Sequence, residues 1–431
     1  MNISFKSTLE QMFLKNNHVL QRVLIVIFIT LCTFVFLYSP GTHDVAIWER
    51  WAKNIELNGL FSGFEINNGD YPPLSSVILF CAVSVSKLSH LSVFISIKLS
   101  ITIFLFLNTY IFWLYTKDFV LSIILHLSLL LNSVALAYID IYFLPALIIS
   151  LWSLKRRKYL LFTIFYLIAC FIKWQPIIIS PFIILYILNI NSFEELKTID
   201  LNKIFNLVIL PTFIFFIIIL YLFGIIPVIT SFAKVLNHKF LSGNALNFNW
   251  ILTNLAKLLF PENFGCLIDG QANYININSL PVLIIIKLPF IIFFLYTLYI
   301  YSKIKKNFEI LIIFSLLSYL TYFIFNTDVH ENHLLIAVVL SVILFWLNDN
   351  YLLWMLVIIL MSNINMYLFY GADGTGLNFS RVIFNIDITF IFSIINVVLY
   401  LILFKICTSS KINNYTQVDR LEAKSSKAAK R

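Results

Sequence analysis

Long apolar runs separated by short polar segments dominate the pattern along the chain. A helix needs about 17–25 apolar residues to cross the hydrocarbon core of a bilayer, and fewer where neighbouring helices shield its ends. The pattern therefore predicts an all-α polytopic membrane protein with about twelve transmembrane helices. The predicted spans lie near residues 20–39, 92–115, 119–137, 139–154, 159–173, 177–192, 205–226, 281–302, 308–326, 333–348, 351–371 and 383–406.

Basic clusters orient these spans, because Lys and Arg in short loops stay on the cytoplasmic side. The clusters at residues 155–158 and 303–306 and the basic tail are expected inside, with both termini cytoplasmic. The apolar segment 74–90 would place the 155–158 cluster outside if it crossed. We therefore expect 74–90 to be a re-entrant or interfacial segment. The polar stretches expected outside are 40–73, 227–280, 327–332 and 372–382, together with the turns around Asp140 and Lys173.

Composition narrows the class of protein further. Of the 431 residues, 60% are hydrophobic and only 12% are charged, whereas soluble domains carry about 25% charged residues. A soluble enzyme, a disordered chain and a disulfide-framed secreted module are therefore excluded. Over half of the net charge of +9 lies in the tail from Lys405 onward, which suits contact with anionic lipid and not with nucleic acid. The five cysteines show no CxxC spacing, and neither a metal nor a cofactor is expected.

Candidate chemistry lies on the outer face. Asp44 follows the first span by a few residues, which places a carboxylate at the membrane boundary, where it is suited to act as a general base. Trp48 and Trp51, spaced i and i+3, form the apolar face of a short interfacial helix or part of an aromatic belt. Further along, Tyr71 stands before two prolines that prevent a helix from starting earlier than Pro73.

A second polar group stands near residue 330. His330, Glu331, Asn332 and His333 lie at the mouth of two apolar spans, where ionisable groups are costly unless they are paired or used. The spacing of the two histidines is that of metal ligands, but no further His or Cys cluster completes a site. Binding of a substrate phosphate or sugar is the favoured interpretation.

These segments, taken in order, resemble the GT-C superfamily of polytopic glycosyltransferases. The resemblance is closest to the enzymes that transfer glucose from a polyprenyl (dolichyl) phosphate, and it spans roughly residues 20–350. It rests on Asp44 in the first outer loop, on the Tyr-Pro-Pro-Leu stretch that begins at Tyr71, and on the His-Glu-Asn sequence that begins at His330. The turn with Asp140 and the Lys173-Trp174-Gln175-Pro176 segment match further parts of the pattern.

The resemblance implies an inverting hexosyltransferase that uses a polyprenyl-phosphate-linked sugar donor and a glycan or lipid-linked acceptor. It implies Asp44 as the catalytic base. The substrate-binding residues implied or proposed with it are Tyr71, Asp140, Lys173, Gln175, His330, Glu331, His333 and Arg381. Lys173, His330 and Arg381 are expected to bind the phosphate, and Asp140 and Glu331 to orient those cations or to contact sugar hydroxyls. Asn332 departs from the pattern, because the family commonly has Lys there.

The expected organisation is a GT-C-like catalytic module over residues 1–350, whose first outer loop (40–73) carries short interfacial helices. C-terminal transmembrane helices follow at 351–406, and a basic cytoplasmic tail at 407–431. The chain uses Ile, Phe, Asn and Lys often, which suggests an AT-rich, bacterial genome. The expected location is then a bacterial inner membrane, with undecaprenyl phosphate as the carrier lipid. If the source is a eukaryote, the endoplasmic reticulum membrane is expected. The alternatives are a secondary transporter or flippase of lipid-linked sugars, an O-antigen ligase or polymerase, and a structural membrane protein. Scarce glycine and the gathering of polar residues at one face favour an enzyme over a transporter.

Overall fold

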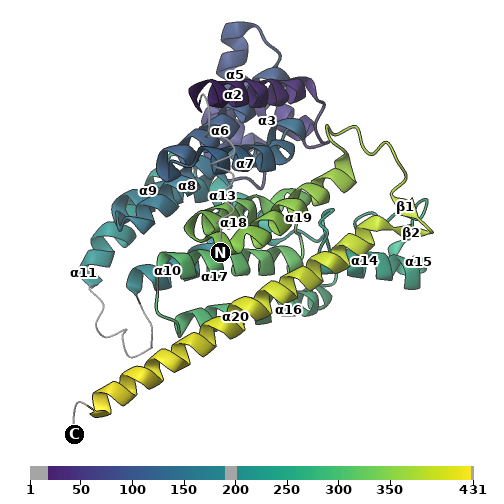
Figure 1. Ribbon diagram of the computed structural model, residues 1–431. Coiled ribbons are helices and arrows are strands. Elements are labelled where there is room, and N and C mark those ends of the chain that lie inside the picture. The colour runs from purple at the N-terminus through teal and green to yellow at the C-terminus, as the bar shows by residue number, and fades with distance from the viewer. Residues whose placement is uncertain (1–17, 190–200, 429–431) are drawn as a thin grey trace. The chain divides into compact units, whose positions relative to one another are not determined.

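The structure is a computed structural model, and it describes residues 18–189 and 201–428. Nearly all of its regular structure is helical (Figure 1). The chain forms two compact units, one from the described residues of Met1–Ile177, Asp200–His238 and Glu331–Arg381, the other from those of Ile178–Ile199, Lys239–His330 and Val382–Arg431. The all-α membrane class expected from the apolar pattern is confirmed.

The first unit contains the segment 40–73, which the sequence predicts as the first outer loop. Its elements are α2 (His18–Val35), η1 (Phe36–Tyr38), α3 (Val45–Asn58), α4 (Leu60–Asn67), α5 (Pro73–Ser89), α6 (Val93–Thr116), α7 (Phe119–Leu130), η2 (Leu131–Ala135), η3 (Ile139–Phe143), α8 (Leu144–Lys155), α9 (Tyr159–Ile172), α11 (Leu201–Ile204), η6 (Phe205–Ile209), α12 (Leu210–Phe223), α13 (Ile225–Leu236), η7 (Glu331–Leu334), α18 (Leu335–Leu347), η8 (Asp349–Tyr351) and α19 (Leu352–Tyr370).

The second unit contains the remaining helices and one small hairpin. Its elements are α10 (Ser180–Leu188), α14 (Phe248–Leu259), α15 (Pro261–Phe264), α16 (Leu280–Ser302), α17 (Phe308–Phe325), β1 (Val382–Ile383), β2 (Ile386–Asp387) and α20 (Ile388–Ala428). The two strands pair antiparallel. Within this unit α17 packs against α16 and α20. The turn η4 (Gln175–Ile179) is divided along the chain, with residues 175–177 in the first unit and 178–179 in the second.

Among the described residues, seven helices are long and apolar enough to cross a membrane. They are Val19–Tyr38, Val93–Thr116, Phe205–Phe223, Leu280–Ser302, Phe308–Phe325, Asp349–Tyr370 and Ile388–Ser409. The protein is therefore an integral membrane protein. Shorter apolar helices stand at most of the other predicted spans, so the number twelve stays a prediction.

Irregular turns interrupt three of the predicted spans. The predicted spans 119–137 and 139–154 meet at η2, a π-helical turn, and at η3, a 3-10 turn; the span predicted at 333–348 opens with the 3-10 turn η7. Non-α backbone at membrane depth is tolerated only where protein or a water-filled cavity surrounds it. All residues of η2 except Leu131, and all of η3 and η7, are buried, and these turns carry the polar side chains described below.

The segment 40–73, which the sequence predicts as the first outer loop, contains the two helices α3 and α4 and is followed by α5. In α3 the buried side chains are Trp48, Trp51, Ala52 and Ile55, the i, i+3, i+4, i+7 stripe of a helix that packs on one face. Helix α3 packs against α4 and α5, and α5 packs in turn on α6. Trp48 and Trp51 are thus part of the protein interior and not of an aromatic belt.

Two predicted segments differ from the structure in detail. The stretch 227–280 was expected to be a long polar outer loop, but it includes most of α13 and all of α14 and α15, because its apolar residues recur at helical spacing. The segment 74–90 forms the single unbroken helix α5, which starts at Pro73 and ends at Ser89. Its placement at the membrane interface stays a prediction.

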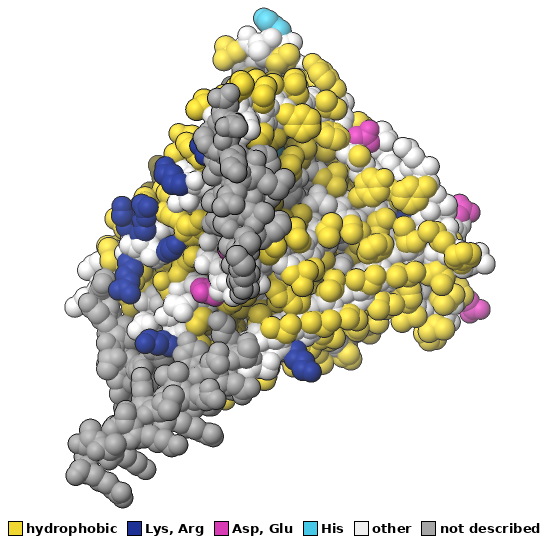
Figure 2. All heavy atoms as spheres, viewed as in Figure 1, with side chains coloured by type: hydrophobic (Ala, Val, Ile, Leu, Met, Phe, Trp, Pro, Cys, Tyr) yellow, Lys and Arg dark blue, Asp and Glu magenta, His cyan; other side chains and the backbone are white. Residues whose placement is uncertain are grey.

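The surface fits a lipid solvent. Hydrophobic side chains cover most of the described surface in view in Figure 2, and charged side chains are few there. Helix α12 alone exposes Phe213, Ile217, Ile218 and Tyr221 to between 49% and 87%. Apolar exposure on this scale is stable only against hydrocarbon or another apolar surface.

Candidate functional site

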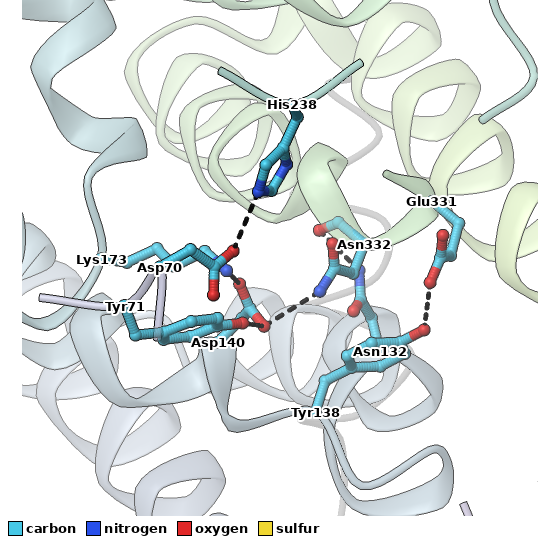
Figure 3. A network of polar contacts seen from close by, with 9 residues as sticks. All are labelled: Asp70, Tyr71, Asn132, Tyr138, Asp140, Lys173, His238, Glu331 and Asn332. Atoms are coloured by element: carbon cyan, nitrogen blue, oxygen red, sulfur yellow. Dashed lines mark hydrogen bonds and ion pairs between the residues drawn. The ribbon is translucent and has the colours of Figure 1, made fainter. Parts of the chain in front are cut away.

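One buried carboxylate, that of Asp140, joins three distant parts of the first unit. Its Oδ1 lies 2.7 Å from Lys173 Nζ. Its Oδ2 accepts hydrogen bonds from the Tyr71 hydroxyl (2.8 Å) and from Asn332 Nδ2 (2.9 Å). Figure 3 shows these three side chains converging on the carboxylate. A buried charge is tolerated when it is paired and hydrogen-bonded in this way.

The backbone around Asp140 explains why its side chain is available. Helix α7 widens into the π-helical turn η2, where Asn132 leaves helical geometry, and Ala137 then takes a left-handed conformation with φ +59°. The chain resumes as η3 and α8, which has Pro145 in its first turn. Asp140 thus stands on a break between two helices, which orients its side chain independently of either helix face.

Lys173 and Tyr71 are held by a group of aromatic rings. The Lys173 ammonium lies 3.6 Å from the centroid of the Tyr71 ring, within the range of a cation–π interaction. The Tyr71 ring packs edge-on against Trp48 and Trp51, at centroid distances of 5.1 and 5.7 Å. Burial and the nearby Asp140 raise the pKa of Tyr71 well above its usual value, so its hydroxyl keeps the proton that it donates.

Asp44 is the more accessible carboxylate of this region. It precedes α3, yet its side chain makes no capping hydrogen bond to that helix, and it remains 25% exposed with His43 Nε2 3.5 Å away. Burial has the largest influence and raises the pKa of the Asp44 carboxyl. The basic side chains of His43 and Lys173 lower this pKa, whereas the carboxylates of Asp140 and Asp70 raise it, and the net shift is upward. Asp44 therefore interacts with the charges of the Asp140–Lys173 pair while its own oxygens stay within reach of a ligand.

Glu331 forms a second buried carboxylate group. One oxygen, Oε1, accepts hydrogen bonds from the hydroxyls of Tyr138 and, at 3.1 Å, Tyr370. The Glu331 carbonyl accepts from Asn365 Nδ2 at 2.8 Å. Asn332, the next residue, is the donor to Asp140, so η7 contributes one side chain to each carboxylate group (Figure 3).

A third set of contacts joins the end of α13 to the loop before α5. His238 Nε2 lies 3.8 Å from Asp70 Oδ2, and Lys234 Nζ donates to the carbonyl of Asn68. Asp70 directly precedes Tyr71, so α13 helps to hold the loop that supplies the tyrosine.

The structure thus brings together five of the predicted site residues. Tyr71, Asp140 and Lys173 are in direct contact. Asp44 interacts electrostatically with Asp140 and Lys173, and Glu331 interacts electrostatically with Asp44. The other four lie elsewhere in the chain or lack a described contact with Asp140. Gln175 is half-buried at the start of η4, and His333 is buried in η7. His330 belongs to the second unit, where its ring lies against Gly243, and the Arg381 guanidinium lies 5.3 Å from the Phe369 ring centroid.

The site also contains residues that the sequence argument passed over. Tyr138 and Tyr370 bind Glu331, and Asn332, noted only as a departure from a pattern, binds Asp140. Tyr138 stands two residues before Asp140, which is a signal that could have been used. Tyr370 carries no local signal.

Within residues 18–189 and 201–428, no three His, Cys, Asp or Glu side chains converge so as to hold a metal ion. What the arrangement offers is one neutralised carboxylate beside a second, partly exposed carboxylate with a raised pKa. Comparison of the chain with models of known protein families and with curated proteins found no match to either.

Proposed function

We propose that the protein is an inverting glycosyltransferase that moves a hexose from a polyprenyl-phosphate donor to an acceptor hydroxyl at the outer face of the membrane. The observation that carries this proposal is the pairing of unlike carboxylates. Asp140 is held by Lys173, Tyr71 and Asn332, whereas Asp44 is partly exposed and has a raised pKa. Two carboxylates in different environments are the usual basis for dividing roles in acid–base catalysis.

Asp44 suits the role of general base. The acceptor hydroxyl gives its proton to the Asp44 carboxylate while its oxygen forms a bond to the anomeric carbon. The bond between that carbon and the donor phosphate oxygen breaks on the opposite face, and the polyprenyl phosphate leaves with the bonding electrons. A raised pKa brings a carboxylate closer to the acidity at which a base works near neutral pH.

Lys173 suits the role of stabilising the leaving phosphate. Its side chain is only 11% exposed and is held by Asp140 and the Tyr71 ring, so its position is fixed before the donor binds. A fixed cation stabilises developing negative charge without the cost of moving into place. Glu331, with Tyr138 and Tyr370, offers oxygen atoms that match sugar hydroxyls.

A transfer assay tests the function directly. The purified protein, in vesicles that contain undecaprenyl or dolichyl phosphate carrying a radiolabelled hexose, is expected to move label from the carrier to a water-soluble or lipid-linked acceptor. Accumulation of label inside the vesicles with the donor intact would instead support a transporter or flippase. Loss of label from the carrier in empty vesicles would show that the assay reports spontaneous hydrolysis.

The proposed orientation has its own test. Asn378, exposed in the loop after α19, is expected outside, and Lys158, exposed between α8 and α9, inside. We expect a cysteine at Asn378→Cys to react with an impermeant maleimide in intact cells, and one at Lys158→Cys to react only after permeabilisation. The reverse labelling pattern would overturn the assignment of the site to the outer face.

A further inference from the structure

A buried lysine near the start of an apolar helix has no role in the proposed chemistry. Lys98 lies in α6 and is fully buried. Its ammonium donates to Ser39 Oγ at 2.8 Å and to the carbonyl oxygen of Val134. A charged group in such a place is costly and is retained only where it is used. Its partners show what the use is.

Lys98 caps the end of the α7–η2 helix. The last carbonyls of a helix have no partner within it, and a cation is favoured there. Three successive carbonyls at this end receive donors from outside the helix. Val134 accepts from Lys98, Ala135 accepts from Ser39 Oγ at 2.6 Å, and Leu136 accepts from the backbone N–H of Thr42 at 3.1 Å.

This cap joins the two segments that carry the carboxylates. Ser39 and Thr42 belong to the segment that leads to Asp44, two residues beyond Thr42. Leu136 leads to Tyr138 and to Asp140, four residues further on. Ser39 accepts from Lys98 and donates to the helix end, so the lysine fastens both segments at once. The register between Asp44 and Asp140 is set at this point.

Close backbone contact reinforces the same register. Gly41 has φ +72°, and a Cβ there would lie 2.7 Å from the Ala137 Cβ and 2.9 Å from the Leu136 carbonyl oxygen. The Gly41 N–H donates to the carbonyl of Asp373 at 3.0 Å. The segment is thus enclosed between the helix end and the turn after α19, with no room to slide while the cap is made.

We propose that Lys98 is a positioning residue that fixes Asp44 against the Tyr138–Asp140 turn by capping the α7–η2 helix. The structural part of this proposal stands on the contacts above, and its catalytic consequence rests on the proposed function. Loss of the ammonium leaves the carbonyl of Val134 without its donor and removes the hydrogen bond that holds Ser39 Oγ at the helix end. Residues 39–44 are then expected to loosen, while the side chains of the site remain intact.

A labelling experiment tests the structural part without any assay of transfer. Thr42 is buried, so a cysteine at Thr42→Cys, in a background with Cys32, Cys81 and Cys266 replaced by Ala, is expected to react slowly with maleimide. Lys98→Met is expected to raise that rate at least tenfold in protein that remains monodisperse. Ser39→Ala removes the hydrogen bond that Ser39 accepts from Lys98 without removing a charge, and it is also expected to raise the labelling rate. Because the two residues act through one link, the double variant Lys98→Met with Ser39→Ala is expected to react little faster than Lys98→Met alone.

Lys306→Met supplies the matched control. Lys306 is also buried and donates to a carbonyl at a helix end, that of Tyr301 at 2.7 Å, but it belongs to the second unit. We expect it to leave the labelling of residue 42 unchanged. Labelling within twofold of the parent in both Lys98→Met and Ser39→Ala would overturn the proposal.

The transfer assay then separates the two proposals. Lys98→Met is expected to lower kcat at least tenfold and to change KM for the donor less than threefold, because the donor-binding groups remain. Faster labelling with unchanged kcat would confine Lys98 to a structural role and refute positioning for catalysis. Faster labelling in a protein whose wild type transfers no sugar would refute the proposed function and leave the cap in place.

Discussion

Asp44→Asn is expected to lower the rate of sugar transfer by about 10²–10⁴-fold, the range that a positioned general base contributes. The amide has nearly the same shape but cannot accept the proton of the acceptor hydroxyl. Because Asp44 makes no capping hydrogen bond to α3, the fold and the binding of the donor are expected to change little. The measurement is kcat for transfer, together with donor affinity by titration.

The pH profile gives the same prediction a second readout. The active form of Asp44 is the carboxylate, and its pKa is raised, chiefly by burial. We therefore expect kcat/KM to fall as the pH drops through a value above about 3.9, the usual aspartate pKa, and we expect this acidic limb to vanish in Asp44→Asn. Asp118→Asn, which changes a helix-capping carboxylate, is the control and should behave as wild type. An unchanged acidic limb in Asp44→Asn would assign the base to another group.

Lys173→Met is expected to damage both stability and transfer. The change leaves the buried Asp140 carboxylate without its cation, and breaking a buried ion pair from one side costs about 3–5 kcal/mol. It also removes the ammonium proposed to stabilise the leaving phosphate, so transfer should fall even at temperatures where the variant is folded. Thermal unfolding in detergent and kcat at low temperature measure the two effects separately.

A double variant distinguishes these effects. Lys173→Met combined with Asp140→Asn removes both charges of the pair, and we expect most of the lost stability to return while transfer stays low. Lys87→Met breaks an exposed ion pair with Glu56 and should cost at most about 1 kcal/mol. Recovery of transfer in the double variant would mean that Lys173 serves only to neutralise Asp140.

Much of the helical architecture could be predicted from the sequence, because apolar side chains must recur over long runs to face lipid. The segments predicted at 281–302 and 308–326 correspond closely to α16 and α17. Helix breaks were harder to predict. The turn η2 consists of residues that also suit a regular helix, and its π geometry depends on partners such as Ser39 and Lys98 for the released carbonyls.

The site was predictable in part for a related reason. Asp44, Asp140 and Lys173 are ionisable residues in a chain that has few of them, and each stands at the end of an apolar run. Their places at the ends of apolar runs and the resemblance to GT-C glycosyltransferases together selected them. Neither could assign their partners, because Asn332 and Asp140 are separated by 192 residues and meet only through folding.

The sequence by itself determined that the chain forms apolar helices that suit a membrane, and that any chemistry it performs must draw on a short list of polar residues. Both follow from the cost of placing charge in hydrocarbon, which acts on every residue locally. Only the tertiary structure decided that Asp140 is neutralised by Lys173 while Asp44 stays partly exposed, and that Tyr138 and Tyr370 share Glu331. Those distinctions depend on burial and on pairs formed between distant segments, and no local pattern encodes either.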